Sequence, residues 1–338
     1  MQTHGHPQTP FPSGFGKTLK LDNVLMACPW GDRPRPPEAP MITKIHRDEL
    51  LKSLIVPPGK KISLQTDYAP DFKPTDITKE DAAALLTAGI QTMAELQDKL
   101  YAQNTYALLI NFQAMDAAGK DSTIKHVMSG VNPQGCQVFS FKVPSAEELD
   151  HDYLWRYFKA LPERGRIGIF NRSYYEEVLV VRVHQALLER QQLPPEAKHN
   201  KMIWQQRFQE INNFEKYLVD NGIVVLKFFL NVSKEEQKKR FLERINRPEK
   251  NWKFSESDVR ERRFWDDYMN AYEEVFRHTS TAWAPWYIIP ADRKWFMRLA
   301  VGVVIFDTLD ALGLQYPKMT ATHQEILRKA KALLESEP

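Results

Sequence analysis

The chain has 338 residues, of which 43% are hydrophobic, and its formal net charge is only +3. These values exclude a disordered or fibrous chain and predict a globular protein with one large domain or two small ones. No apolar run approaches the roughly 20 residues of a membrane-spanning helix, and two cysteines are too few for a disulfide framework. We therefore expect a cytoplasmic protein without membrane association.

The first 40 residues are rich in Pro, Gly and His and show no lasting periodicity, which predicts a flexible arm. His4 and His6 in this arm could bind a metal or could simply be an unstructured pair. Residues 41–105 are expected to form an N-terminal helical extension, because a helical spacing of Ala and Leu runs from Ile77 to Asn104.

From residue 106 onward, strand-like and helix-like segments alternate along the chain. This alternation predicts an α/β fold in which a parallel sheet is covered by helices on both faces. Ser145 with Glu148, and Ser233 with Glu236, have the spacing of helix capping boxes. The expected strands are residues 106–112, 137–143, 166–170, 223–230 and 286–289, and the expected helices start near Asp121, Ser145, Ser173, His199, Ser233 and Lys294, with a polar loop near Pro194.

A phosphate-binding loop is predicted directly after the first core strand. The sequence from Ala114 to Thr123 approaches the pattern G-x-x-x-x-G-K-[ST], in which backbone N–H groups and a helix N-terminus surround a phosphate. Two positions depart from it, since Ala114 replaces the first Gly and Asp121 replaces the hydroxyl residue. The expected phosphate contacts are Ala117, Ala118, Gly119, Lys120, Asp121, Ser122 and Thr123.

Asp116 is an acidic residue inside this anion-binding loop. A carboxylate there would repel phosphate unless a cation lies between them, which indicates a role in holding a metal ion. The alternative is that Asp116 is the N-cap of the helix that follows.

Several motifs, in order along the chain, resemble the polyphosphate kinase type 2 family. The resemblance extends from about Leu50 to Pro317 and rests on residues 115–120, 129–133, 170–175, 235–237, 248–253 and 284–286. It implies a P-loop kinase-like three-layer α/β/α sandwich with a core at residues 106–317, a helical lid at about 233–280 and a C-terminal tail at 318–338. It also implies Mg²⁺ (or Mn²⁺) as cofactor and a homo-oligomer, a dimer or a tetramer.

The metal ligands implied by this resemblance are Asp116, Asp121 and Asn171. Many family members have Asp where this chain has Asn171, and an amide binds Mg²⁺ more weakly than a carboxylate does. Asp116, Asp121 and Glu176 or Glu177 would then supply the missing negative charge. The sequence after Asn171, together with Asp121, resembles the subgroup that phosphorylates both AMP and ADP.

Arginine and lysine residues outside the loop are the candidates for stabilising charge during phosphoryl transfer. Arg172 follows the third strand and is predicted to act beside Asp116 and Lys120 as a catalytic residue, or else to pair with Glu176 or Glu177. The candidates for holding the acceptor nucleotide are Lys142, Arg156, Arg207, Glu176 and Glu177.

The segment from Ser233 to Arg263 has eleven Lys or Arg and seven Asp or Glu, a surplus of four positive charges. Arg240, Arg244 and Arg247 are spaced to share one helix face. They would form a solvated stripe or, with Lys250 and Lys253, a track for a polyanionic donor. Nearby tryptophans favour packing in the core and lid over stacking on nucleic acid.

These residues together predict an enzyme that transfers a phosphoryl group between inorganic polyphosphate and AMP, ADP or ATP. Two rival hypotheses remain. One is an ATP-dependent nucleotide kinase of the thymidylate kinase type, and the other is a P-loop protein that binds polyphosphate or nucleic acid without catalysis.

Overall fold

The computed structural model describes residues 44–75 and 77–337, so the expected N-terminal arm with His4 and His6 lies outside the described residues. Five strands form one parallel sheet in the order β2-β3-β1-β4-β5. Their bounds are β1 Ala107–Gln113, β2 Cys136–Ser140, β3 Ile167–Asn171, β4 Ile223–Asn231 and β5 Trp286–Pro290. The predicted parallel sheet is therefore confirmed.

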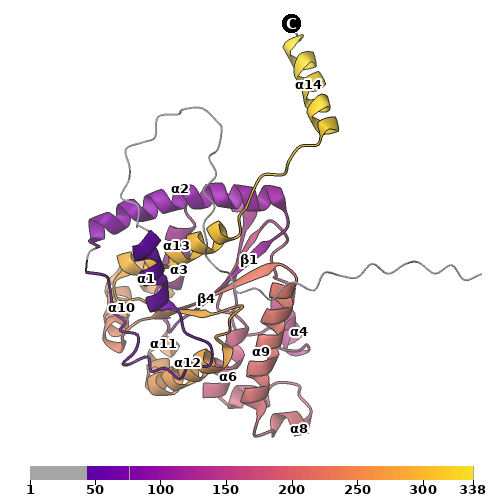
Figure 1. Ribbon diagram of the computed structural model, residues 1–338. Coiled ribbons are helices and arrows are strands. Elements are labelled where there is room, and N and C mark those ends of the chain that lie inside the picture. The colour runs from indigo at the N-terminus through magenta and orange to yellow at the C-terminus, as the bar shows by residue number, and fades with distance from the viewer. Residues whose placement is uncertain (1–43, 76, 338) are drawn as a thin grey trace, which may run out of the picture. The chain divides into compact units, whose positions relative to one another are not determined.

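Helices cover both faces of the sheet (Figure 1). On one side α13 packs against α2 and α3, and on the other side α9 packs against β4 and α12. The bounds of these helices are α2 Lys79–Gln103, α3 Lys120–Val127, α9 Ile203–Asp220, α12 Trp265–Thr279 and α13 Lys294–Ala311. The arrangement is the predicted three-layer sandwich.

Further helices connect these layers or flank them. The α-helices are α1 Lys44–Leu54, α4 Ala146–Leu149, α5 Trp155–Phe158, α6 Val180–Val183, α7 Ala186–Glu189, α8 Pro195–Lys198, α10 Lys234–Asn246, α11 Glu256–Glu261 and α14 Ala321–Glu335. The 3-10 turns are η1 Pro133–Gly135, η2 Tyr174–Glu177, η3 Pro248–Lys253 and η4 Arg262–Phe264. No helix within residues 44–75 and 77–337 is long and apolar enough to cross a bilayer.

Three local predictions need correction. The helix expected after Ser173 is the short 3-10 turn η2, and the expected loop near Pro194 contains the one-turn helix α8. The long helix starts at Ile203 rather than His199, since the intervening residues form a turn.

The two predicted capping boxes have different outcomes. The box at Ser145 is complete, because the Glu148 carboxylate also accepts a hydrogen bond from the backbone N–H of Ser145. At Ser233 only half of the box forms: its hydroxyl accepts from the Glu236 N–H at 3.1 Å, but the Glu236 carboxylate pairs with Arg240 instead. The prediction of a full box at Ser233 was therefore wrong.

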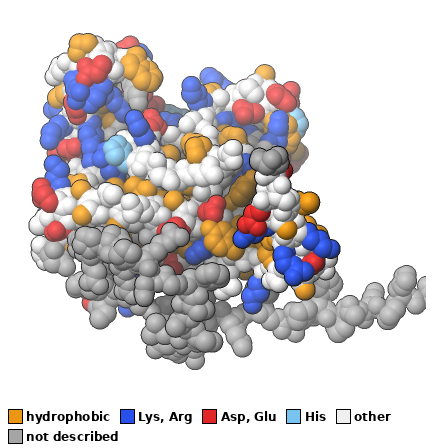
Figure 2. Space-filling view, turned by 90° about the horizontal axis from the view of Figure 1, so that it is seen from above, with side chains coloured by type: hydrophobic (Ala, Val, Ile, Leu, Met, Phe, Trp, Pro, Cys, Tyr) orange, Lys and Arg blue, Asp and Glu red, His pale blue; other side chains and the backbone are white. Residues whose placement is uncertain are grey.

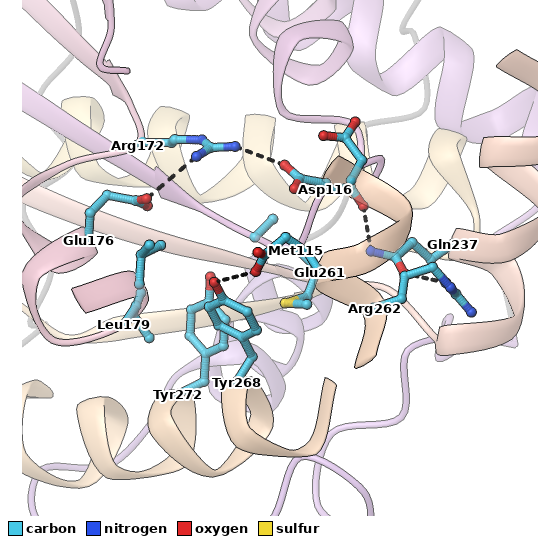
Figure 3. Close-up of a pocket in the computed structure, with 13 residues that line it drawn as sticks. Met115, Asp116, Arg172, Glu176, Leu179, Gln237, Glu261, Arg262, Tyr268 and Tyr272 are labelled. Carbon is cyan, nitrogen blue, oxygen red and sulfur yellow. Dashed lines mark hydrogen bonds and ion pairs between the residues drawn. The ribbon is translucent and has the colours of Figure 1, made fainter. Parts of the chain in front are cut away.

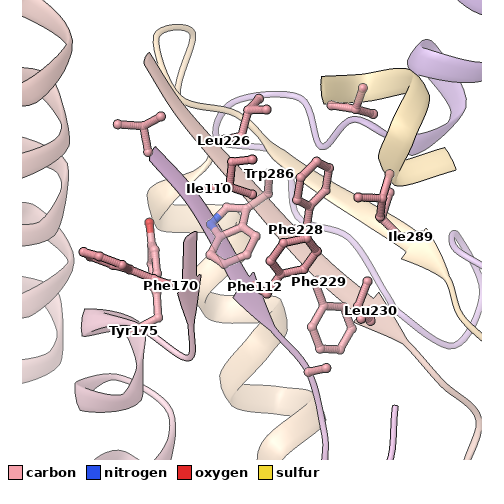
Figure 4. Close-up of a cluster of buried hydrophobic side chains, with 14 of the residues drawn as sticks. Ile110, Phe112, Phe170, Tyr175, Leu226, Phe228, Phe229, Leu230, Trp286 and Ile289 are labelled. Atoms are coloured by element: carbon pink, nitrogen blue, oxygen red, sulfur yellow. The ribbon is translucent and has the colours of Figure 1, made fainter. Parts of the chain in front are cut away.

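The core lies along the central strands β1 and β4 (Figure 4). All seven residues of β1 are buried, as expected for a strand covered on both faces. Phe112 of β1 stacks on Phe228 of β4 with ring centroids 5.2 Å apart. The fully buried Trp286 of β5 donates its indole N–H to the Thr279 hydroxyl at 2.9 Å, which satisfies the only polar group of its side chain.

A buried ion pair lies beneath the segment that follows β3. The Lys227 ammonium is 2.6 Å from the Glu215 carboxylate, and both side chains are fully buried. The hydroxyls of Tyr174 and Tyr175 each donate to the same carboxylate at 2.8 Å. Because these tyrosines directly follow Arg172 and Ser173, the network anchors the turn that places Arg172 at the carboxyl edge of the sheet.

Candidate active site

The phosphate loop, residues 114–119, joins the end of β1 to the start of α3. Its backbone contains two left-handed residues, Ala117 with φ of 61° and Gly119 with φ of 111°. Gly119 is the N-cap of α3, so the alternative in which Asp116 caps this helix is wrong. The loop therefore ends at a helix N-terminus, where the backbone N–H groups of the first turn and the helix dipole create positive potential, which suits an anion.

Lys120 is the first residue of α3 and reaches back over the loop. Its ammonium donates to the Ala114 carbonyl at 2.9 Å. Burial, together with the positive charge of Arg172, lowers the pKa of Lys120 to about 8, while Asp116 and Glu176 oppose that shift. An anion bound at the loop would favour the protonated ammonium.

The hydroxyls of Ser122 and Thr123 lie at the same helix N-terminus. Both donate to the Gly119 carbonyl at 3.0 Å. Thr123 is completely buried. In this structure the two predicted phosphate contacts therefore stabilise the first turn of α3.

Arg172 lies opposite the phosphate loop, just beyond the end of β3 (Figure 3). Its guanidinium is 2.8 Å from the Asp116 carboxylate and 3.6 Å from that of Glu176. These two carboxylates, Glu176 first, raise the pKa of Arg172. Arg172 also has a φ of 67°, unusual for a residue with a side chain, and its N–H donates to the Phe112 carbonyl at 3.1 Å. The structure thus brings together the three predicted catalytic residues.

Two of the predicted metal ligands lie together at the carboxyl edge of the sheet. The Asn171 side-chain amide donates to the Asp121 carboxylate at 2.7 Å, whereas the Asp116 carboxylate is engaged by Arg172. Within residues 44–75 and 77–337, no three His, Cys, Asp or Glu side chains gather as a metal cluster. The protein alone therefore offers few oxygen ligands, which is the usual situation for Mg²⁺ bound mainly by phosphates and water.

A pocket opens between the phosphate loop and the predicted lid (Figure 3). Its loop side is formed by Ala114, Met115 and Asp116, with Arg172 and Glu176 beside them. Its other wall consists of Leu179, Val180, Gln237, Asp258, Glu261, Arg262, Tyr268 and Tyr272. The predicted lid thus lies beside the predicted catalytic residues.

Sequence reasoning did not assign the polar residues of the far wall to the site. They are Gln237, Asp258, Glu261, Arg262, Tyr268 and Tyr272. Gln237 belongs to the motif at residues 235–237 on which the family resemblance rests, and that motif was the available signal. Asp258 and Glu261 had been counted only as charges of the basic segment. Burial, and the negative charge of Asp116, raise the pKa of Asp258.

The predicted acceptor residues are not gathered in this pocket, apart from Glu176. Arg207 pairs with Glu177 at 3.2 Å and with Glu210 at 2.8 Å, and it is 9% exposed. Arg156 pairs with Glu148 at 3.3 Å and donates to the Lys142 carbonyl at 3.0 Å. The Lys142 side chain is exposed.

The predicted track on α10 also differs from expectation. The prediction that Arg247 shares a helix face with Arg240 and Arg244 was wrong, because the helix ends at Asn246. Arg240 is only 5% exposed and therefore does not belong to a solvated stripe. The Arg244 guanidinium is 3.8 Å from the Asp258 carboxylate. The side chain of Lys253 lies outside the described residues.

Beyond α10, the basic residues are paired with acidic neighbours. Arg247 pairs with Glu243 at 3.1 Å and with Glu249 at 2.6 Å, and Lys250 pairs with Glu243 at 2.6 Å. Lys250 in particular lowers the pKa of Glu243 to about 2. Figure 2 likewise shows basic and acidic side chains interspersed over the face it presents. The segment is therefore a network of exposed ion pairs rather than a uniformly basic surface.

Comparison with known proteins gives consistent results. Residues 76–317 match the family model described as Polyphosphate kinase 2. An ADP-polyphosphate phosphotransferase of Rhodopseudomonas palustris is 51% identical over 84% of this chain and 98% of its own length. An AMP/ADP-polyphosphate phosphotransferase of Meiothermus ruber is 42% identical over 82% of this chain and 99% of its own.

A solved structure supports the same relationship. The crystal structure of Polyphosphate Kinase 2 from Arthrobacter aurescens TC1 superposes with a TM-score of 0.72 at 38% identity, covering 81% of this chain and 98% of that one. Fold, motif order and relatives therefore agree, and the chain belongs to the polyphosphate kinase 2 family.

Proposed function

We propose that this protein transfers a phosphoryl group from inorganic polyphosphate to AMP, ADP or both, reversibly, so that ADP and ATP are formed. The observation that carries the proposal is the phosphate loop, with Lys120 at its end and Arg172 facing it across the pocket. The named activities of relatives at 42% and 51% identity support the choice of polyphosphate and adenine nucleotides.

The reaction needs positioning and charge stabilisation more than covalent chemistry. The bond between the donor's terminal phosphorus and its bridging oxygen breaks, and a new P–O bond forms to an oxygen of the acceptor's last phosphate. Polyphosphate shortened by one phosphate leaves with the bridging oxygen. In this proposal the N-terminus of α3 and the Lys120 ammonium hold phosphate oxygens. Arg172 neutralises charge on the transferred group, with Asp116 and Glu176 fixing its orientation through the ion pairs of 2.8 and 3.6 Å.

We propose Mg²⁺ as the cofactor, with Mn²⁺ as a substitute. Asp116, Asp121 and the amide oxygen of Asn171 are hard oxygen ligands at the carboxyl edge of the sheet and would hold the ion together with substrate phosphates. When bound, the ion would neutralise phosphate charge. The negative charge of Asp116 would then offset the positive charges of both the ion and Arg172.

The donor is proposed to run along the basic end of the lid segment, past Arg244, Arg247, Lys250 and Lys253. Most of these cations already have carboxylate partners, so polyphosphate would compete with Glu243, Glu249 and Asp258 for them. We also propose a homo-oligomer, either a dimer or a tetramer, which analytical ultracentrifugation would test.

One assay tests the proposed function. Purified protein is incubated with AMP or ADP, Mg²⁺ and long-chain polyphosphate in the absence of ATP, and nucleotides are separated by chromatography. Formation of ADP or ATP is the expected result. A parallel incubation contains ATP and AMP without polyphosphate, and phosphoryl transfer in this incubation alone would indicate a nucleotide kinase. Salt-sensitive binding of polyphosphate without any turnover would indicate a non-catalytic P-loop protein.

A further inference from the structure

Three successive carbonyls of the phosphate loop accept hydrogen bonds from helix α10. The Gln237 amide donates to the Asp116 carbonyl at 2.8 Å. The Arg240 guanidinium donates to the carbonyls of Ala117 at 3.3 Å and Ala118 at 2.6 Å. Helix α10, more than 100 residues further along the chain, thus binds the loop through three of its carbonyls.

These hydrogen bonds determine the direction in which the backbone N–H groups of the loop point. In a planar trans peptide the C=O of one residue and the N–H of the next point in opposite directions. With the carbonyls of Asp116, Ala117 and Ala118 directed toward α10, the N–H groups of Ala117, Ala118 and Gly119 are directed away from it. The Ala118 N–H also donates a hydrogen bond to the Met115 carbonyl at 3.3 Å, which closes a turn within the loop.

The hydrogen bonds from α10 hold the loop in a backbone conformation that is unfavourable for Ala117. Ala117 has a φ of 61°, in the left-handed region that side chains other than Gly rarely adopt. Its carbonyl is one of those bonded by Arg240. A loop free of α10 would relax toward ordinary dihedral angles, which would turn its N–H groups.

Arg240 is fully occupied by these contacts. Its five N–H donors match five partners, since it also donates to the carbonyls of Ala291 at 2.6 Å and Asp292 at 3.2 Å and to the Glu236 carboxylate at 2.9 Å. It is 5% exposed. A guanidinium used in this way is not available to hold a substrate phosphate.

Gln237 connects the same loop to the far wall of the pocket. Its side-chain oxygen accepts a hydrogen bond from Arg262, whose guanidinium also donates to the Lys234 carbonyl at 3.1 Å. Figure 3 shows this series running from Asp116 through Gln237 to Arg262. The loop is therefore tied to both α10 and the turn η4.

We propose that Arg240, assisted by Gln237, is a positioning residue that holds the phosphate loop in its anion-binding conformation. This role replaces the predicted one, in which Arg240 contacts the polyphosphate donor. The inference rests on the proposed function, because its readout is phosphoryl transfer.

The first test compares Arg240→Met and Arg240→Lys with the exposed neighbour Lys238→Met on the same helix as control. We expect Arg240→Met to lower kcat by about 10²-fold, because a small misplacement of binding groups has effects of that size. The decrease should be equal for tripolyphosphate and long-chain polyphosphate, with the donor KM changed less than about twofold. Arg240→Lys should recover only part of the rate, since an ammonium has three donors and no planar fork.

A second variant separates positioning from mere loss of fold. In Arg240→Ala, added methylguanidinium should restore a measurable fraction of kcat, and it should not do so in Arg240→Met, where the side chain fills the space. Gln237→Met, which keeps a similar size but removes the donor to the Asp116 carbonyl without adding a charge, should lower kcat by about three- to tenfold, an effect matching the loss of one hydrogen bond. Circular dichroism checks that each variant is folded.

The outcomes distinguish the two claims. If the unaltered protein does not transfer phosphate, the proposed function fails. If it does, and Arg240→Met retains kcat while its KM rises selectively for long-chain polyphosphate, Arg240 contacts the donor and the positioning role is wrong. A normal kcat and KM in Arg240→Met would also overturn it, as would the absence of rescue by methylguanidinium in a folded, inactive Arg240→Ala.

Discussion

Helix α10 and the residues that follow it use arginine in different ways. Arg240, near the middle of α10, is 5% exposed and bonds to carbonyls of the phosphate loop. Arg247, two turns later, is 50% exposed and pairs with Glu243 and Glu249. Burial fixes the first arginine among backbone groups, whereas the second can exchange its partners for a solvated polyanion. Spacing on a helix therefore does not determine the role of a cation.

The largest effect should come from the cation of the phosphate loop itself. Lys120→Met removes the ammonium that reaches across the loop and should lower kcat by at least about 10²- to 10³-fold, as loss of a preorganised charge does. Polyphosphate-dependent ATP formation measures it, and the exposed Lys125→Met on the same helix is the control. A kcat of Lys120→Met within tenfold of that of the unaltered protein would show that Lys120 is not a catalytic residue.

A second variant tests Lys227, a buried cation in the ion pair that supports the fold. Lys227→Met leaves the Glu215 carboxylate buried without its partner and should destabilise the fold by about 3–5 kcal/mol. Urea denaturation followed by circular dichroism gives the free energy of unfolding.

The double variant Glu215→Gln with Lys227→Met should lose less stability than Lys227→Met alone, since no uncompensated charge remains. The exposed pair of Lys216 and Asp220 is the surface counterpart, and Lys216→Met should cost at most about 1 kcal/mol. Equal losses at the two lysines would contradict the contrast between buried and exposed cations.

The sequence predicted the phosphate loop because its signals are local: a strand, Gly119-Lys120 and a helix follow one another directly. It could not predict the partners of Arg240, since helical spacing shows which residues share a face but not which distant segment that face meets. The same limit applies to Asp258 and Arg262, which reach the pocket only through the fold of the lid segment.

The protonation of Lys120 gives a pH dependence of intermediate size. Its pKa of about 8 means that the free enzyme loses this positive charge as the pH rises through 8. The value of kcat/KM should fall about tenfold between pH 7 and pH 9, because the protonated fraction falls by that factor. In Lys120→Arg the decline should disappear, since a guanidinium stays charged. An unchanged decline in that variant would assign the titration to another group.

The smallest effect is expected at the ion-paired arginines that follow Arg240. Arg244→Ala combined with Arg247→Ala should raise the KM for long-chain polyphosphate about three- to tenfold and leave kcat within about twofold, because solvated ion pairs contribute little each. The rise should shrink in high salt, where exposed charges are screened. The matched control is Lys238→Ala with Lys239→Ala, which removes the same charge from exposed positions of α10. If both double variants raise the KM equally, the donor senses only the total charge of this segment. If only the arginine pair does, the cations beyond Arg240 form the track for the donor. Arg240 itself, bonded to the loop carbonyls, does not belong to that track.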